Sequence, residues 1–386
     1  MSNKEIVKLS RRTFVVGAAG ITAAVLFGCS DDSQSNDDQN AVDSQIQPET
    51  SVETQTIIDM EGTEVVLPYD LKNVAITSWK GAIGVFVLFG EYKRIKICCD
   101  TSRYRWLCHA LPELATLPDF GSFDEISLEE MMQAKPDVII SPEQAANATK
   151  QLRNLGLAVV VDGATPKDSQ DTFATAHAER ELIAQMLHTE DLLEKYNKWS
   201  DSLMQEVESR VADIPDESRK KVLVTRTNME EVFCENINLG HSATLAGGIL
   251  VTEGMTDYYT TVDTEQIVQW NPDVIFQQIV TIDQDTMSGI YREWQNDERY
   301  KNINAIQSGD VYIIPMGITQ WSGDVESALG ILLMAKQMYP EKFEDMDVLE
   351  YAKEFYSEFM QYDLGEDDYK YLFVDMDGAK PLGIIK

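Results

Sequence analysis

Short apolar runs and longer amphipathic stretches follow one another in a regular order from residue 54 onward. Runs such as "NVAIT", "RIKICC" and "PDVIIS" stand next to stretches in which apolar residues recur every three or four positions. Short apolar runs are typical of strands enclosed in a parallel sheet, and the longer spacing is typical of helices packed by one face. Strands that alternate with helices predict an α/β fold with mainly parallel sheets.

A second block of the same kind follows a long stretch without glycine or proline. That stretch, residues 171–213, predicts one long connecting helix with a bend or break, so the lobes should cover residues 54–170 and 214–386. The apolar stripe of the helix is expected at Leu192, Tyr196, Trp199, Leu203, Val207 and Val211.

Two segments on either side of this helix repeat each other. "SLEEMMQAKPDVIISPEQ" and "DTEQIVQWNPDVIFQQIV" each contain a glutamate, a helical stretch, Pro-Asp and an apolar strand. The match sets Glu129 opposite Glu265, although a register shift of one residue would select Glu130 instead. A helix, Pro-Asp and a strand also coincide by chance, but the matched glutamate and apolar spacing favour two similar Rossmann-like lobes.

The first residues form an export signal of a different composition. The apolar part of "SRRTFVVGAAGITAAVLFGCSDD" is shorter than the roughly 20 residues that span a bilayer, and it suits a signal peptide. "SRRTF" resembles the twin-arginine signal, and "LFGC" resembles a bacterial lipobox, although Phe27 is bulky for that motif. We therefore expect residues 1–29 to be the signal, with Cys29 as the lipidated residue. Residues 30–53 are expected to form a disordered acidic linker. The alternative is an ordinary cleaved signal followed by a disordered tail.

The charge of the chain limits the class of partner, and its cysteines limit the possible disulfides and metal sites. The chain of 386 residues has 32 Lys and Arg against 65 Asp and Glu, a formal net charge of -33. So negative a surface repels phosphate backbones, which excludes a nucleic-acid partner. If Cys29 carries lipid, an even number of cysteines remains, with pairing open among Cys98, Cys99, Cys108 and Cys234. Their spacing matches no zinc motif.

The chain resembles the substrate-binding lipoproteins that deliver iron-siderophore complexes, haem or cobalamin to ABC importers. The resemblance covers about residue 54 to the C-terminus and rests on the order of "DMEGTEVVLP", the two "PDVI" strands, "NLGHSATLAGGILV", "WQNDERYKNINAIQSGDVYIIP" and "WSGDVESALGILLMAKQMYPEKF". It implies two α/β lobes joined by one rigid helix, with the ligand in a cleft between them. It also implies that Glu129 and Glu265 pair with arginines of the importer. The alternative is that each glutamate is only a solvated carboxylate that favours the N-terminus of its helix.

The same resemblance implies the partners. They are an importer permease and ATPase, a small metal chelate (an iron-siderophore, with haem or cobalamin as alternatives) and the cell membrane through lipid on Cys29. We expect an extracytoplasmic monomer without a cofactor of its own and without enzymatic activity.

Ligands of open α/β lobes lie beyond the carboxyl ends of the strands. Aromatic, basic and amide side chains at the expected strand ends would suit a planar anionic chelate. Taken singly, each aromatic residue is more often part of the core, and Arg105 has Glu113 or Asp119 as alternative partners. The candidate ligand-binding residues are Trp79, Arg103, Tyr104, Arg105, Trp106, Arg226, Gln277 and Trp321. Direct metal ligation by His109, Tyr258 or Tyr259 is a weaker hypothesis.

Two rivals remain. An exported enzyme would suit the twin-arginine signal, but the chain has no GxSxG, HExxH or GxGxxG motif after a strand. A lipid-anchored chelate sensor would share the fold without an importer. A neighbouring permease and ATPase would favour import, and turnover of a chelate would favour the enzyme.

Overall fold

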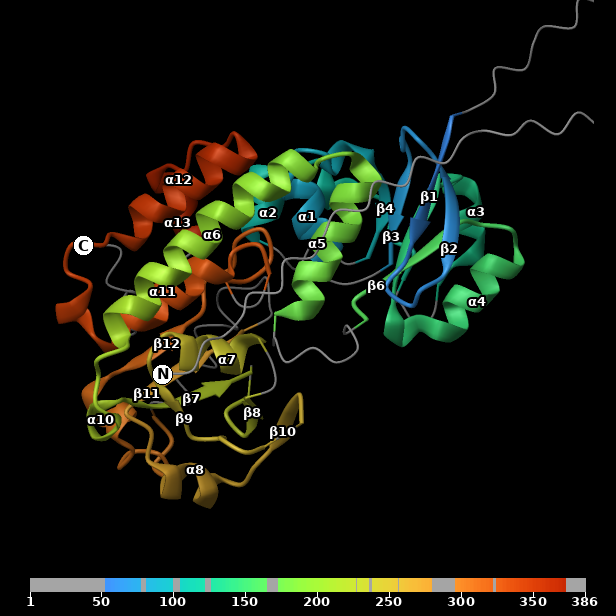
Figure 1. Cartoon of the computed structure of the whole chain (residues 1–386). Helices are drawn as coiled ribbons and strands as arrows, with labels where there is room; N and C mark the ends of the chain where they lie inside the picture. Colours follow the sequence, from blue (N-terminus) through green and yellow to red (C-terminus); the bar gives the residue numbers. More distant parts are fainter. Residues whose placement is uncertain are drawn as a thin grey trace, which may run out of the picture. The chain divides into compact units, whose positions relative to one another are not determined.

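The N-terminal lobe is built on a four-stranded parallel sheet with the strand order β4-β3-β5-β6 (Figure 1). In this computed structural model the described residues are 53–77, 81–99, 105–121, 126–164, 173–226, 228–235, 238–255, 257–279, 296–321 and 324–372. The strands are β3 (Val74–Ile76), β4 (Ile95–Cys98), β5 (Val138–Pro142) and β6 (Val159–Asp162). The helices of this lobe are α1 (Gly81–Leu88), α2 (Arg105–Ala110), α3 (Leu128–Ala134) and α4 (Ala146–Asn154).

A hairpin precedes this sheet, as the turn at Glu61 and Gly62 predicts. Strands β1 (Thr54–Ile58) and β2 (Glu64–Pro68) pair antiparallel. Gly62 has a φ of 87°, and the Asp59 carboxylate accepts the backbone N–H groups of the turn.

The C-terminal lobe has a mixed sheet with the order β10-β8-β7-β11-β12, and β9 also pairs with β7. Its strands are β7 (Lys221–Thr225), β8 (Glu231–Phe233), β9 (Ile249–Leu250), β10 (Tyr259–Thr261), β11 (Val274–Gln277) and β12 (Val311–Ile313). The four strands β7, β9, β11 and β12 are parallel, whereas β8 and β10 form an antiparallel end that the sequence pattern did not predict. The helices are α7 (Asn238–Leu245), α8 (Thr264–Trp270), α10 (Asn304–Ser308), α11 (Ser327–Met338), α12 (Val348–Met360) and α13 (Glu366–Leu372).

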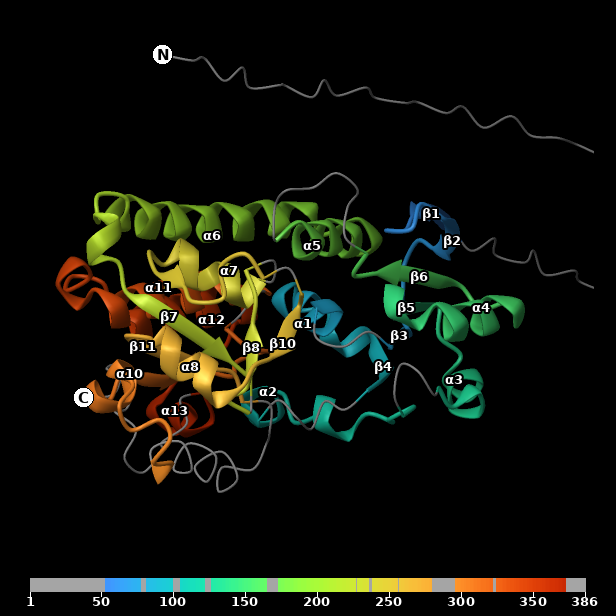
Figure 2. The same ribbon diagram turned by 90° about the horizontal axis from the view of Figure 1, so that it is seen from below.

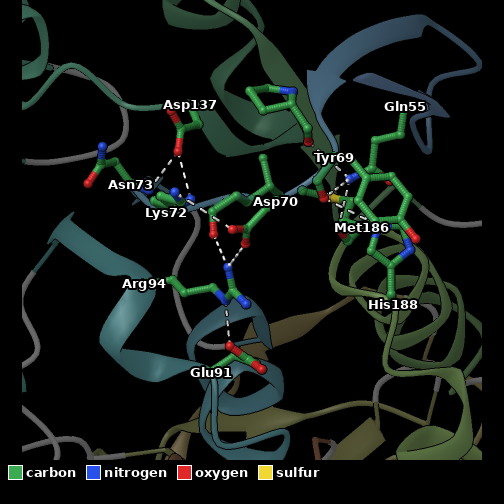
Figure 3. Close-up of polar contacts among 12 residues, drawn as sticks. Gln55, Tyr69, Asp70, Lys72, Asn73, Glu91, Arg94, Asp137, Met186 and His188 are labelled. Atoms are coloured by element: carbon green, nitrogen blue, oxygen red, sulfur yellow. Dashed lines mark hydrogen bonds and ion pairs between the residues drawn. The ribbon is translucent and has the colours of Figure 1, made fainter. Parts of the chain in front are cut away.

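The connecting segment consists of two helices, α5 (Ala174–Leu187) and α6 (Glu190–Val211), so the expected break is present. His188 lies at the break with a φ of 56°, a left-handed conformation that ends α5. The hairpin holds this point: Gln55 Nε2 donates to Met186 O at 3.0 Å, and the His188 ring stacks on Tyr69 with centroids 4.0 Å apart (Figure 3). The break therefore has a fixed position on the N-terminal lobe.

The apolar stripe of α6 differs from the prediction at one position. Leu192 is 42% exposed, and its neighbour Leu193 is buried in its place. The other predicted positions do contact the core, with Trp199 half-buried against Phe355 at 5.1 Å between ring centroids. The buried stripe runs through Leu193, Ser200 and Val207, which are seven residues apart and therefore share one face of the helix.

Alternate residues of each parallel strand enter different cores. Val138 and Ile140 join the large cluster that runs through both lobes and the helices α5, α6 and α11, whereas Ile139 faces a smaller cluster under α3 and α4. In the C-terminal lobe, Phe276 joins the large cluster and Ile275 faces the smaller one under α8 and α10. The outer helices α3 and α8, which lie on different lobes (Figure 1, Figure 2), thus each cover the smaller cluster of their own sheet.

Candidate functional site

The repeated segments fold into the same local structure in both lobes. Each outer helix has seven residues, with a side-chain cap in front: Ser127 Oγ accepts from Glu130 N at 3.4 Å, and Asp263 Oδ1 accepts from Gln266 N at 2.8 Å. Each helix ends in a left-handed residue, Lys135 with φ 46° and Asn271 with φ 47°. The sequence alignment of the two segments is therefore correct in register.

The Pro-Asp pair after each helix ties it to the first strand of its sheet. Asp137 Oδ2 accepts the backbone N–H groups of Lys72 and Asn73 at 2.7 and 2.8 Å (Figure 3). Asp273 Oδ2 accepts the N–H of Lys221 at 3.0 Å, and each aspartate also donates its own N–H back to the same strand. Aspartate at this place fixes how the helix meets the strand that follows it.

Glu129 and Glu265 are the second residues of α3 and α8, and both are exposed. The equivalent caps align Glu130 with Gln266, so the register does not select Glu130. Within the described part of the chain, neither Glu129 nor Glu265 pairs with a basic side chain. Their importer-docking role stays a prediction, although the geometry presents one ionisable group from each lobe in the same way.

The surroundings of the two glutamates differ. The first residue of α8, Thr264, is buried, and its Oγ1 accepts from Arg299 Nη1 at 2.9 Å and donates to Glu230 Oε1 at 2.9 Å. Arg299 also binds Asp297, with Nη2 to Oδ2 at 2.6 Å. In α3 the equivalent first residue is Leu128, which is exposed. Charged side chains thus support the end of α8 but not, among the described residues, that of α3.

The C-terminal strand ends carry the predicted Arg226 and Gln277. Arg226 directly follows β7, and its guanidinium lies 4.5 Å from the ring centre of Tyr259 and 3.4 Å from Glu231 Oε2. Gln277, at the end of β11, is buried and donates from Nε2 to Arg226 O at 3.2 Å. The structure therefore brings these two residues together at the edge where the sequence predicted a ligand.

The two predicted tryptophans are more deeply buried than side chains that line a ligand cleft. Trp106 and Trp321 are fully buried, and both contact Tyr356: the Trp106 ring lies tilted with its centroid 4.4 Å from that of Tyr356, and Trp321 Nε1 donates to the Tyr356 hydroxyl at 3.2 Å. The Trp106 indole N–H has no acceptor among the described residues. A ligand-binding role for both residues stays a prediction.

The remaining predicted residues are on or near α2, or outside the described residues. The guanidinium of Arg105 lies 5.7 Å from the ring centre of Tyr371, and His109 Nε2 lies 3.0 Å from Asp368 Oδ1. The structure forms no disulfide among Cys98, Cys99, Cys108 and Cys234. The predicted sites outside the described residues are Cys29, Trp79, Arg103 and Tyr104.

A buried acidic junction, made by Asp162, Glu179, Asp324 and Glu326, was not predicted. Glu179 on α5 hydrogen-bonds Asp162 at the end of β6, and burial beside Asp162 and Asp324 raises the pKa of Glu179 well above its ordinary value. Glu326 accepts from the N–H groups of residues 318 and 319 and from Tyr356, yet burial raises the pKa of Glu326 to about 7. The only sequence signal was a glutamate on the apolar face of α5.

Glycines allow α1 to approach this junction. A Cβ at Gly81 would collide with the Glu179 carboxylate, and one at Gly84 would lie 2.8 Å from Asp324 Oδ2. Asp324 belongs to the C-terminal lobe and α1 to the N-terminal lobe, so the junction joins both lobes and α5.

Among the described residues, no group of acidic, histidine and cysteine side chains could hold a metal ion. None of the described helices is long and apolar enough to cross a membrane.

Comparison with known proteins identifies the family. A family model described as "Periplasmic binding protein" matches residues 81–316, more than half of the chain. The chain belongs to the periplasmic binding protein family. The two-lobed α/β fold predicted from the sequence is confirmed by a periplasmic solute-binding protein of Veillonella parvula, with a TM-score of 0.71 and 23% identity, covering 86% of this chain and 100% of that one.

Two curated relatives have named ligands. The molybdate-binding protein MolA of Haemophilus influenzae is 22% identical over 265 residues, covering 64% of this chain and 74% of MolA. Its molybdate-bound structure has a TM-score of 0.70, at 19% identity, and covers 81% of this chain and 99% of that one. The Fe(3+)-citrate-binding protein YfmC of Bacillus subtilis is 29% identical over 207 residues, covering 50% of this chain and 58% of YfmC.

Proposed function

We propose that this periplasmic binding protein captures an iron-siderophore or related metal chelate outside the cytoplasmic membrane and delivers it to an ABC importer. The observation that carries the importer role is the matched presentation of Glu129 and Glu265 on equivalent capped helices. An exposed carboxylate from each lobe suits two arginines on a two-fold importer, because opposite charges orient an encounter and speed it. MolA is the cognate periplasmic binding protein of an ABC transporter, which supports the same class of partner.

The ligand class is inferred from the strand ends and the relatives. Arg226 at the end of β7 offers guanidinium donors to an anionic chelate, and YfmC is named for a ferric chelate. Haem or cobalamin would use the same aromatic and cationic groups. Molybdate, the ligand in MolA's name, is the competing small anion.

We also propose that the mature protein is a lipoprotein anchored through Cys29, exported by the twin-arginine route. Residues 30–53 would then tether the binding protein to the membrane close to its importer. These residues lie outside the described part of the chain, so their sequence alone supports this proposal.

The importer role is tested by separating uptake from ligand binding. Glu129→Gln combined with Glu265→Gln should reduce uptake of the bound chelate at least tenfold, because both importer contacts lose their charge, while ligand affinity measured by calorimetry stays unchanged. The matched control is Glu64→Gln with Glu208→Gln, which removes the same charge from exposed positions elsewhere. Equal uptake by the two double variants would contradict the docking assignment, and chemical turnover of a bound chelate would favour an enzyme.

A further inference from the structure

The antiparallel end of the C-terminal sheet carries a line of aromatic rings that the proposed function does not yet use. Phe233 is buried on β8 and meets Tyr258 at 6.3 Å between ring centroids, and Tyr258 meets Tyr259 at 5.8 Å, both in edge-on geometry. Tyr258 is 66% exposed and Tyr259 44% exposed. Adjacent exposed tyrosines on a short edge strand do not serve the core, since only Phe233 is enclosed.

Arg226 extends this line of rings with a cation. Its guanidinium lies 4.5 Å from the ring centre of Tyr259, and one nitrogen lies 3.4 Å from Glu231 Oε2. The stack holds the guanidinium beside the rings without using the outer face of Tyr258. Aromatic and guanidinium groups held this way bind at a low cost in conformational entropy.

The position of the rings also points to a ligand. Arg226 directly follows β7 at the carboxyl end of a parallel sheet, where open α/β lobes bind small molecules. Figure 1 and Figure 2 both show β8 and β10 at the end of the sheet that lies toward the N-terminal lobe.

We propose that Arg226, Tyr258 and Tyr259, which we name the aryl platform, select a negatively charged chelate that carries aromatic rings. This inference rests on the proposed function and narrows its ligand class. The exposed rings offer flat faces and edges to other rings, whereas Arg226 supplies the charge complement.

A small oxyanion fits the aryl platform less well. Such an anion would need several converging N–H donors, and the aryl platform has a single guanidinium, one nitrogen of which lies 3.4 Å from Glu231 Oε2. An aromatic chelate gains from both tyrosine rings without displacing Glu231. The platform therefore favours an aryl chelate over molybdate or ferric citrate.

The test is calorimetric titration of the purified full chain with three probes: iron(III) catecholate, iron(III) citrate and molybdate. We expect the tightest binding for iron(III) catecholate, and a loss of about 10- to 100-fold for that probe when Tyr258→Leu and Tyr259→Leu are combined, because two ring contacts disappear. Any binding of iron(III) citrate should change less than threefold. Tyr69→Leu, at a tyrosine that is also 44% exposed but packs on His188, is the matched control and should leave all affinities unchanged.

The outcomes separate this inference from the proposed function. Tightest binding of iron(III) citrate or molybdate would overturn the aryl platform while leaving a substrate-binding protein. An unchanged affinity of the double tyrosine variant for iron(III) catecholate, with an unchanged melting temperature, would also overturn it. Failure to bind all three probes would overturn the aryl platform and would leave only haem or cobalamin, the alternatives named above, as ligands for the proposed function.

Discussion

The carboxylates of the outer helices and those of the buried acidic junction lie in opposite surroundings. Glu129 and Glu265 stand in the first turns of α3 and α8, and both side chains are exposed to solvent. Glu179 and Glu326 are enclosed by protein, and burial raises the pKa of each. One pair is available to a partner, whereas the other can affect only the protein's own stability.

Acidic side chains therefore have two different roles in this chain, depending on whether they are exposed or buried. An exposed carboxylate costs the fold little, so it can be placed wherever a partner requires charge. A buried carboxylate is costly when ionised, so its presence couples the fold to pH. The following predictions test how separate the two regions are, beginning with the largest effect.

The outer helices should depend on one buried anchor each. Met131 and Ile267 occupy equivalent positions and are fully buried, so Met131→Ala and Ile267→Ala should each lower the free energy of unfolding by about 2–5 kcal/mol. Urea denaturation measures this. The adjacent residues Met132 and Val268 are exposed, and Met132→Ala and Val268→Ala should each stay within about 0.5 kcal/mol. Equal costs at the buried and exposed positions would contradict the assigned packing.

The buried acidic junction should make stability fall as pH rises. The pKa of Glu326 is raised from 4.5 to about 7, so the folded state holds a proton between these values that the unfolded state has released. Stability from this group is complete below pH 4.5 and falls by about 3 kcal/mol as pH approaches 7, with no further slope above. The raised pKa of Glu179 acts in the same direction.

Glu326→Gln should remove this part of the pH dependence, as measured by urea denaturation from pH 4.5 to 8. The readout is the slope rather than the absolute stability, because glutamine cannot accept all the bonds that the carboxylate accepts. Glu265→Gln is the control and should keep the wild-type slope. A wild-type slope in Glu326→Gln would show that another group titrates in this window.

Local repetition made the outer helices predictable. The caps, the buried anchor and the Pro-Asp pair all lie within one short segment, so the sequence determines their register in both lobes. Strands β8 ("EVF") and β10 ("YTT") contain polar or exposed residues and no continuous apolar run, unlike the equally short buried strands β3 and β12 that the sequence did predict. The stripe on α6 runs through Leu193, which shares a helix face with Ser200 and Val207, whereas the apolar spacing alone also allowed Leu192.

The buried acidic junction could not be predicted because its members are distant in sequence. Asp162, Glu179 and Asp324 come from β6, α5 and the segment before α11, and only the folded chain brings them together. The tryptophans illustrate the same limit. Their places after expected strands identified Trp106 and Trp321 as candidates, but their shared contact with Tyr356 of α12 forms only in the folded chain.

Replacing Arg299 should have the smallest effect on stability of these changes, and it tests whether the outer helices α3 and α8 differ in how they meet the importer. It donates to Thr264, next to Glu265, and binds Asp297, with its side chain 59% exposed. Arg299→Gln should cost less than about 1 kcal/mol in unfolding free energy, because exposed ion pairs contribute little. It should also make the end of α8 more negative, so association with the importer at low salt should become a few-fold faster, as measured by stopped-flow mixing with the reconstituted importer. The increase should vanish at high salt. A slower association would instead mean that Arg299 itself contacts an acidic group of the importer. The α8 end would then bind the importer through a basic group as well as Glu265, whereas the α3 end would use Glu129 alone.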